Sequence, residues 1–217
     1  MPPFNGWREG LPYYGPLLGA ALVLALALRP WGWSWVALIP LAAGLAAAAF
    51  FRDFPRQCPG HPAVFYAPAD GTVAAVEDLT ETPHYEGPCR RISIFMSVFN
   101  AHVNRAPCAG TVRDVRYAPG RYRDARDPES SQVNESNAVW LDTEHGPVTV
   151  RQIAGAVARR IVCPAREGMQ LSAGQKFGMI RFGSRVELYL PTGVHVQVKV
   201  GDRTRAGLTP VARIDTP

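Results

Sequence analysis

The sequence is short of charge near its N-terminus. Charged residues make up 19% of the 217-residue chain, yet between Gly10 and Phe51 only Arg29 carries a charge. So few polar side chains remain there that a helix would have no polar face to present to water. This makes a soluble helical hairpin the weaker interpretation and favours a region that associates with a membrane.

The apolar region consists of two runs, residues 16–28 and residues 31–51. A bilayer core about 30 Å thick needs about 20 helical residues, so the first run is too short to span it. The second run is long enough, but Pro40 would kink a helix there. A signal peptide is disfavoured, because the apolar residues continue past any signal-peptide core and no small-residue cleavage site follows. We therefore expect an apolar helical hairpin, which either dips into the bilayer or crosses it.

Positive charges flank this region on both sides, at Arg8 and at Arg52 and Arg56. Flanks rich in arginine and lysine tend to stay on the cytoplasmic side of a membrane. We therefore expect residues 1–57 to form a hairpin and linker at the cell membrane, with residues 58–217 facing the cytoplasm.

Paired cysteines are also lacking. The four cysteines are scattered without the spacing of a zinc site or of a disulfide framework, and they lie at Cys58, Cys89, Cys108 and Cys163. This pattern fits a reducing cytoplasm, and we expect no metal site.

After the apolar region, short runs of β-type residues alternate with glycine and proline. Two segments repeat each other at one proline, one glycine, one threonine and two valines: residues 68–76, PADGTVAAV, and residues 107–115, PCAGTVRDV. Each segment is typical of a tight turn that leads into a strand. The whole pattern predicts a mainly β, barrel–sandwich-like domain over residues 58–217.

Such repeats are similar to those of the biotinyl- and lipoyl-binding barrel–sandwich proteins. A membrane-tethered carrier or binding module without catalysis is therefore an alternative. A carrier needs an exposed lysine at a hairpin tip, and the two lysines of the chain, Lys176 and Lys199, do not lie in a Met-Lys or Asp-Lys tip. The carrier is the weaker hypothesis.

Residues 177–191, FGMIRFGSRVELYLP, contain two β-type segments that meet at Gly183-Ser184. A Gly-Ser dipeptide between strands is usually a turn or a bulge. A chemical interpretation is also open, because a serine hydroxyl can attack the preceding glycine carbonyl where the backbone is held bent and a base takes the proton. Elimination of the resulting ester would cut the chain and leave a pyruvoyl ketone on the serine. Such a ketone forms a Schiff base with a substrate amine and acts as an electron sink for decarboxylation.

The run GMIRFGSRV followed by LYLP resembles the processing site of the phosphatidylserine decarboxylase family, in its short form that includes archaetidylserine decarboxylase-like members. The resemblance implies self-cleavage between Gly183 and Ser184 into a β fragment, residues 1–183, and an α fragment, residues 184–217. It also implies a covalent pyruvoyl cofactor derived from Ser184, and conversion of phosphatidylserine to phosphatidylethanolamine with release of carbon dioxide.

Residues 100–107, NAHVNRAP, resemble a short-family element with the sequence Asp-Val-His-Val-Asn-Arg-Ala-Pro. Asn100 stands in place of the usual acid, and Arg105 stands where longer members carry a second histidine. The resemblance implies that His102 is either the base for processing or a substrate-site histidine. It places Arg105 among the substrate-binding residues.

Two further elements carry residues over from the family. Asp70, in a Pro-Ala-Asp-Gly turn, matches the acid of an Asp/His/Ser set, where a carboxylate would hold the imidazole in one tautomer; an ordinary turn residue is the alternative. Residues 134–137, NESN, are similar to the family's Asn-Glu-Arg-Asn run. This similarity implies that Glu135 and Asn137 bind substrate near the pyruvoyl group.

A group of arginines is interleaved with two tyrosines, and the chain has a formal net charge of +5. Nucleic acid is one candidate partner for such a patch, and solvated loop charge is another explanation. Because the chain also carries an apolar anchor, we expect an anionic membrane surface as the partner of this patch and no nucleic acid. Phosphatidylserine is the partner that the family resemblance implies, and a homo-oligomer is an open possibility. The group comprises Arg113, Arg116, Arg121, Arg123 and Arg126, with Tyr117 and Tyr122.

Overall fold

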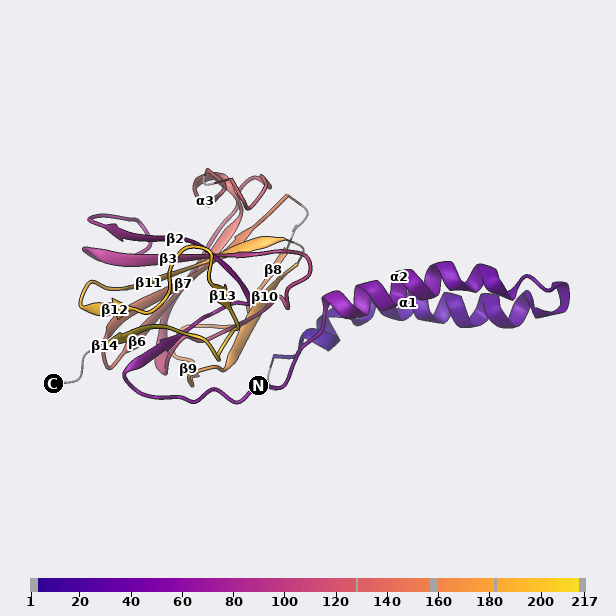
Figure 1. The fold of residues 1–217 in the computed structure, drawn as a ribbon, viewed down its shortest axis with the longest axis horizontal. Coiled ribbons are helices and arrows are strands. Elements are labelled where there is room, and N and C mark those ends of the chain that lie inside the picture. Colours follow the sequence, from indigo (N-terminus) through magenta and orange to yellow (C-terminus); the bar gives the residue numbers. More distant parts are fainter. Residues whose placement is uncertain (1–3, 128, 157–159, 182, 215–217) are drawn as a thin grey trace. The chain divides into compact units, whose positions relative to one another are not determined.

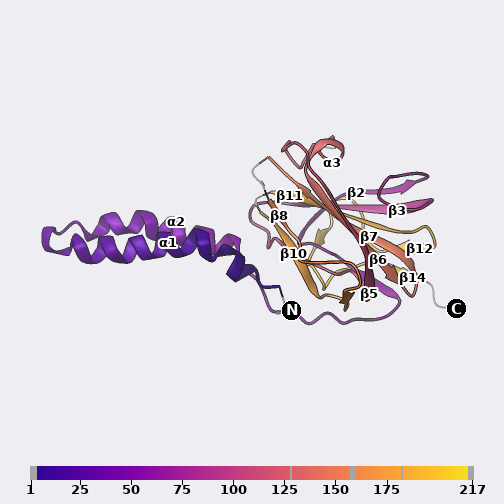
Figure 2. The same ribbon diagram turned by 180° about the vertical axis from the view of Figure 1, so that it is seen from behind.

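The structure is a computed structural model that describes residues 4–127, 129–156, 160–181 and 183–214. The chain divides into two compact units, which Figure 1 and Figure 2 show from opposite sides. Residues 5–54 form a helical unit, and the residues from Pro55 onward belong to a unit built mainly of β-strands. The predicted mainly β fold with an apolar N-terminal helical region is confirmed.

The first helix, α1 (Gly6–Ala27), begins well before the predicted apolar run. It has 22 residues and a mean hydropathy of 1.5 over its apolar window, so by length and composition it is able to cross a membrane. Asn5 caps its N-terminus, because the side-chain Oδ1 accepts the backbone N–H of Trp7 at 3.0 Å. The expectation that the first helical segment is too short to span a bilayer is therefore wrong.

The second helix, α2 (Leu38–Phe50), is preceded by two short 3-10 turns, η1 (Arg29–Trp31) and η2 (Ser34–Ala37). Pro40 lies in the first turn of α2. A proline is tolerated there because the N–H that it lacks would have no partner within the helix. The predicted kink is therefore wrong, and the second apolar run is a turn followed by a helix of 13 residues.

Helices α1 and α2 lie side by side (Figure 1), and two glycines let them approach closely. A Cβ atom on Gly10 would lie 2.4 Å from Cγ of Phe51, and one on Gly44 would lie 2.7 Å from Cδ2 of Leu18. Small residues serve the same purpose where helices pack within membranes.

The largest sheet of the β unit has eight antiparallel strands and curls into a half-barrel (Figure 2). Strand β11 lies inside this sheet, so it is hydrogen-bonded on both edges, to β3 and to β7. In spatial order the strands are β13 (Arg203–Thr204), β2 (Gly71–Leu79), β3 (Cys89–Met96), β11 (Ser184–Pro191), β7 (Gly146–Ala154), β6 (Ser136–Thr143), β5 (Gly110–Ala118) and β9 (Gln170–Leu171).

Two smaller sheets complete the unit. One short helix, α3 (Ser130–Val133), precedes β6. The first small sheet contains β1 (Val64–Tyr66), β14 (Pro210–Ile214) and β12 (Val194–Val196), and the second contains β4 (Val103–Arg105), β10 (Lys176–Arg181) and β8 (Arg160–Val162).

The two repeated segments of the sequence form equivalent strands. Strands β2 and β5 each have nine residues. Their pairing is irregular at the same point of the repeat, between Val73 and Ala75 in β2 and between Val112 and Asp114 in β5. Matching bulges of this kind indicate two copies of one supersecondary unit, and the predicted turn-and-strand pattern is confirmed.

Alternation along β11 gives the large sheet two faces. The inner face carries Ser184, Val186 and Leu188, and the last two are fully buried in the main hydrophobic core with side chains of both small sheets. The outer face carries Arg185 and Glu187. The sequence predicted this alternation, which follows from the two-residue period of a strand.

Candidate active site

The Gly183–Ser184 bond lies where the chain passes from one sheet to another. Strand β10 ends at Arg181 in a three-stranded sheet, and β11 begins at Ser184 in the large sheet. Gly183 has a φ of 60°, in the left-handed region that favours glycine. Ser184 is fully buried and pairs with Met96 on one side and Ala154 on the other. The bond is thus a bent link whose C-terminal side is fixed by two neighbouring strands.

The side chains of Ser184 and Asn104 meet at the sulfur of Met96. The Ser184 hydroxyl donates to Met96 Sδ at 3.4 Å, and the Asn104 amide Nδ2 donates to the same atom at 3.9 Å. A thioether sulfur is a weak acceptor, so neither donor is tightly held by it. Both side chains are fully buried. The serine hydroxyl therefore lies near an amide donor in a site shielded from bulk water.

A row of buried amides leads away from this point. Gln152 Nε2 donates to Asn104 Oδ1 at 2.8 Å, and Asn137 Nδ2 donates to Gln152 Oε1 at 3.2 Å. Burial raises the pKa of the Cys163 thiol to about 11, although a hydrogen bond with Asn137 acts in the opposite direction. Because Gln152 holds the Asn104 oxygen, the Asn104 nitrogen is directed at Met96.

Sequence reasoning found Asn137 but missed Asn104 and Gln152. The feature that could have identified these two residues is a polar side chain at a strand position that faces the core.

His102 is fully buried and directly precedes β4, which begins at Val103. Its Nδ1 lies 2.9 Å from the backbone oxygen of Asn100. Because a carbonyl oxygen only accepts, Nδ1 carries the proton and Nε2 is the basic nitrogen of the neutral ring. The His102 carbonyl accepts the N–H of Ile180 at 3.3 Å, so the histidine is tied to the strand that leads to the Gly183–Ser184 bond.

Asp70 has described partners other than histidine. Its carboxylate accepts two hydrogen bonds from the Arg56 guanidinium, at 2.5 and 2.7 Å, and one from the Ala206 N–H at 2.8 Å. A bidentate pair of this kind is strong and directional. The predicted Asp70–His102 partnership stays a prediction. The described partner of the His102 ring at Nδ1 is the main-chain carbonyl of Asn100.

Two further predicted residues, Arg105 and Glu135, have described hydrogen bonds within the fold. Arg105 is buried and donates from Nη1 to the carbonyl of Gly174 at 2.9 Å. Glu135 accepts the Tyr122 hydroxyl at 2.7 Å, and its own carbonyl accepts the Ala154 N–H at 2.9 Å. Glu135 therefore braces the residue that pairs with Ser184. Contact of either side chain with substrate remains a prediction.

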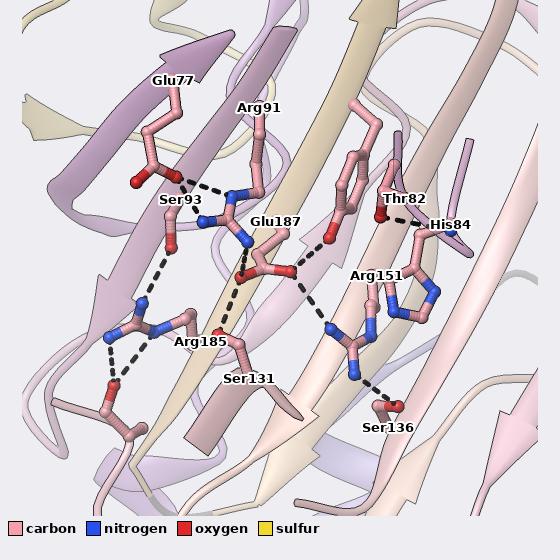
Figure 3. A network of polar contacts seen from close by, with 12 residues as sticks. Glu77, Thr82, His84, Arg91, Ser93, Ser131, Ser136, Arg151, Arg185 and Glu187 are labelled. Atoms are coloured by element: carbon pink, nitrogen blue, oxygen red, sulfur yellow. Dashed lines mark hydrogen bonds and ion pairs between the residues drawn. The ribbon is translucent and has the colours of Figure 1, made fainter. Parts of the chain in front are cut away.

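Behind the serine, the outer face of β11 carries a buried network of charged groups (Figure 3). The fully buried carboxylate of Glu187 accepts from Tyr189 at 2.6 Å, from Ser131 at 2.8 Å and from Arg151 at 3.3 Å. Burial alone would raise the pKa of Glu187, but the Tyr189 hydrogen bond and the charges of Arg151 and Arg91 outweigh it and lower this pKa. The carboxylate is therefore ionised and fully hydrogen-bonded.

Most of the predicted basic cluster is neutralised within the fold. Arg126 pairs with Asp124 at 2.6 Å, and Arg116 lies 4.4 Å from the centroid of the Trp140 ring. Exposed ion pairs of this kind are weak, so the arginines remain available for other partners, but their carboxylates cancel much of the positive field. An anionic membrane as their partner stays a prediction. The remaining described pairs are Arg113–Glu86, Arg113–Asp142, Arg116–Asp114, Arg123–Asp127 and Arg123–Glu129.

The sequence of the chain matches those of a known protein family. The phosphatidylserine decarboxylase family model matches residues 44–212. The phosphatidylserine decarboxylase proenzyme of Nitrosomonas eutropha is 44% identical over 207 residues, which cover 94% of this chain and 93% of that relative. Proteins of the same name from Syntrophus aciditrophicus and Nocardia farcinica are 40% and 44% identical and cover 94% and 99% of this chain, and 95% and 89% of their own lengths. With likeness over nearly its whole length, the chain belongs to the phosphatidylserine decarboxylase family.

Proposed function

We propose that the protein is a phosphatidylserine decarboxylase that matures by cutting itself between Gly183 and Ser184. The main support is the position of Ser184, which is buried at the first residue of a central strand, directly after a glycine with a φ of 60°. The relatives are named proenzymes, a name that implies maturation. By this proposal the cut yields fragments 1–183 and 184–217.

In the proposed cut, the Ser184 hydroxyl gives its proton to Nε2 of His102, and its Oγ bonds to the carbonyl carbon of Gly183. The C–N bond then breaks and the nitrogen takes up the proton, leaving an ester. Loss of the Ser184 Cα proton breaks the Cβ–Oγ bond and releases Gly183 as a carboxylate. Addition of water to the remaining nitrogen-bearing carbon expels ammonia and leaves a ketone on residue 184. The hydrogen bond from His102 Nδ1 to the Asn100 carbonyl supports the base role, because it leaves Nε2 as the nitrogen that can take up a proton.

The surroundings of Ser184 fit a pyruvoyl group. The site is buried, and the Asn104 amide, which donates to the same Met96 sulfur as Ser184, is an N–H donor of the kind that a ketone oxygen accepts. When present, a pyruvoyl group supplies a carbonyl that takes up the electrons freed as the substrate loses carbon dioxide. The buried residues around position 184 would hold that carbonyl and exclude bulk water, and Gln152 would keep the Asn104 amide oriented.

We propose phosphatidylserine as the substrate, with phosphatidylethanolamine as the product, and the side chains of Arg105, Glu135 and Asn137 as contacts for the polar headgroup. Helix α1 would keep the enzyme at the cell membrane, with the domain of residues 58–217 on the cytoplasmic side. The relatives' name and the apolar helix support this assignment.

Intact-mass analysis of the purified protein tests the proposal. We expect two fragments whose masses place the cut before residue 184, with the smaller fragment lacking a free amine. The Ser184→Ala variant should remain a single chain without decarboxylase activity, because the attacking hydroxyl is gone. Ser172→Ala, at an exposed serine, should be cut and active as the wild type. An intact wild-type chain, or a free serine amine at residue 184, would contradict the proposal and leave a membrane-tethered β module.

His102→Ala separates the two roles open to this histidine. Slow or absent cutting assigns His102 as the base for the cut. Normal cutting with lost turnover moves it to the substrate site.

A further inference from the structure

Gly155 lies directly across from the carbonyl that the proposed cut would attack. Ala154 ends β7 and pairs with Ser184, so one further step along both strands sets Gly155 opposite Gly183. A Cβ atom on Gly155 would lie 2.1 Å from the Gly183 carbonyl oxygen and 3.0 Å from its carbonyl carbon. The first distance is far inside the repulsive range for carbon and oxygen, so a side chain at position 155 requires this peptide group to move.

The backbone on the Gly155 side has little freedom to move instead. The Ala154 carbonyl accepts from Asn134 Nδ2 at 2.7 Å, and the Ala154 N–H donates to the Glu135 carbonyl at 2.9 Å. Both hydrogen bonds are next to the glycine in the chain, and both are buried. Displacing Gly155 would therefore cost the pairing of the residue that holds Ser184 in register.

The other side of Gly155 is occupied as well. The same Cβ would lie 3.2 Å from Cβ of Ala125. The Ala125 carbonyl is fixed by the Arg185 guanidinium, which donates to it from Nε at 3.0 Å and from Nη2 at 2.7 Å. Packed interiors transmit such crowding rather than absorb it, so the Gly183 peptide is the group that would yield.

We propose that Gly155 is a positioning residue for self-cleavage: its lack of a side chain lets the Gly183 carbonyl lie where the Ser184 hydroxyl attacks it. This inference rests on the proposed function. Attack requires Oγ to approach the carbonyl carbon from outside the peptide plane, so a push on the carbonyl oxygen that rotates this plane removes the alignment. Misplacement by about 1 Å is enough to slow a positioned reaction roughly 100-fold.

The role is confined to the uncut chain. Once the bond is broken, Gly183 is the C-terminus of its fragment and its carboxylate is no longer held by the covalent link to Ser184. The terminal residue then has room to turn away from position 155. Gly155 therefore governs the rate at which the enzyme forms and not the turnover of the enzyme once formed.

The test compares Gly155→Ala with Gly193→Ala, because a Cβ on Gly193 would meet no heavy atom within 4 Å. Newly synthesised full-length chain is sampled over time, and the cut fraction is measured by intact mass. We expect Gly155→Ala to be cut about 100-fold more slowly than the wild type, and Gly193→Ala to be cut at the wild-type rate. Decarboxylase activity per pyruvoyl group in any matured Gly155→Ala should equal that of the wild type.

A second pair of variants separates positioning from folding. In the uncut Ser184→Ala background, adding Gly155→Ala should leave the circular dichroism and the cooperative unfolding transition in place. Loss of that transition, or a fall in activity per pyruvoyl group that matches the fall in cutting rate, would assign Gly155 a structural role and overturn the inference. Cutting of Gly155→Ala at the wild-type rate would overturn it too, while leaving the proposed function intact. A wild-type chain that is never cut would remove both.

Discussion

The two faces of β11 are equally buried and chemically opposite. On the inner face, Val186 and Leu188 are fully buried among apolar side chains. On the outer face, Glu187 is also fully buried, but it is surrounded by arginines, hydroxyls and an aromatic ring (Figure 3). Burial of the inner face is favourable whatever the orientation of the side chains, whereas the outer face is stable only if each polar group meets its partner.

The polar contacts of the outer face hold the strand in register. A slip of one residue would turn every side chain of β11 to the opposite face. It would place the Glu187 carboxylate in the apolar core and remove its bonds to Ser131 and Arg151. The outer network therefore fixes which residue faces inward at the start of the strand, and that residue is Ser184.

The largest expected effect is on the outer face. Glu187→Ala would leave Arg151 buried without its carboxylate, so we expect a loss of about 3–5 kcal/mol in the free energy of unfolding. The measurement is urea unfolding in detergent, in the Ser184→Ala background so that the chain stays in one piece.

Glu77→Ala is the matched control, because Glu77 pairs with Arg91 in the same network but its side chain is 45% exposed. It should change the free energy of unfolding by at most about 1 kcal/mol. Equal effects of the two substitutions would show that burial does not set the strength of this network.

On the inner face, Leu188→Ala should lower the free energy of unfolding by about 2–5 kcal/mol, because it removes apolar contacts and leaves a cavity. Leu188→Met keeps the volume and should cost less than about 1.5 kcal/mol. Both are measured by the same urea unfolding. If Leu188→Ala proves as mild as Leu188→Met, the inner face does not stabilise the sheet through close packing.

The smallest expected effect is on the pH dependence of stability, and it comes from His84. The His84 ring lies beside the outer face, 5.8 Å from the ring of Tyr189. Burial, assisted by the charge of Arg151, lowers the pKa of His84 from 6.5 to about 4. Since the folded state resists protonation that the unfolded state accepts, this histidine contributes stability above pH 6.5 that is lost as the pH falls towards about 4. We expect the urea midpoint of His84→Gln to fall less steeply over this range, with His195→Gln, at an exposed histidine, matching the parent. A slope in His84→Gln as steep as that of the parent would contradict the assignment.

The sequence predicts the alternation along β11 better than it predicts the burial of the polar face. Alternation of Val186 and Leu188 with Arg185 and Glu187 predicts a strand with two unlike faces, and the structure has it. Burial of the polar face was not predictable, because it depends on distant segments such as α3 that fold over the sheet. A local pattern records the period of a strand but not what covers it.

The candidate site divides in a similar way. Ser184 and His102 stand in recognisable runs, so sequence alone singled them out. The contacts around them were not predictable from the sequence. The Asn100 contact is made by a backbone oxygen, and the contact of Asn104 with Gln152 joins two different sheets. For Asp70, the turn motif predicts a functional carboxylate but not the ion pair with Arg56, and its role in a set with His102 and Ser184 stays a prediction.

The interior position of β11 also bears on what a break before Ser184 would do to the molecule as a whole. The fragment that starts there contributes β11, which pairs with β3 and β7 of the other fragment. Its strands β13 and β14 pair with β2 and β1 of the other fragment, and β12 pairs with β14. Two polypeptides paired in this way would elute together in gel filtration and would separate only in denaturant. The cut protein would keep the fold of its precursor, so the reactive ketone would form without loss of the pairing between the two fragments.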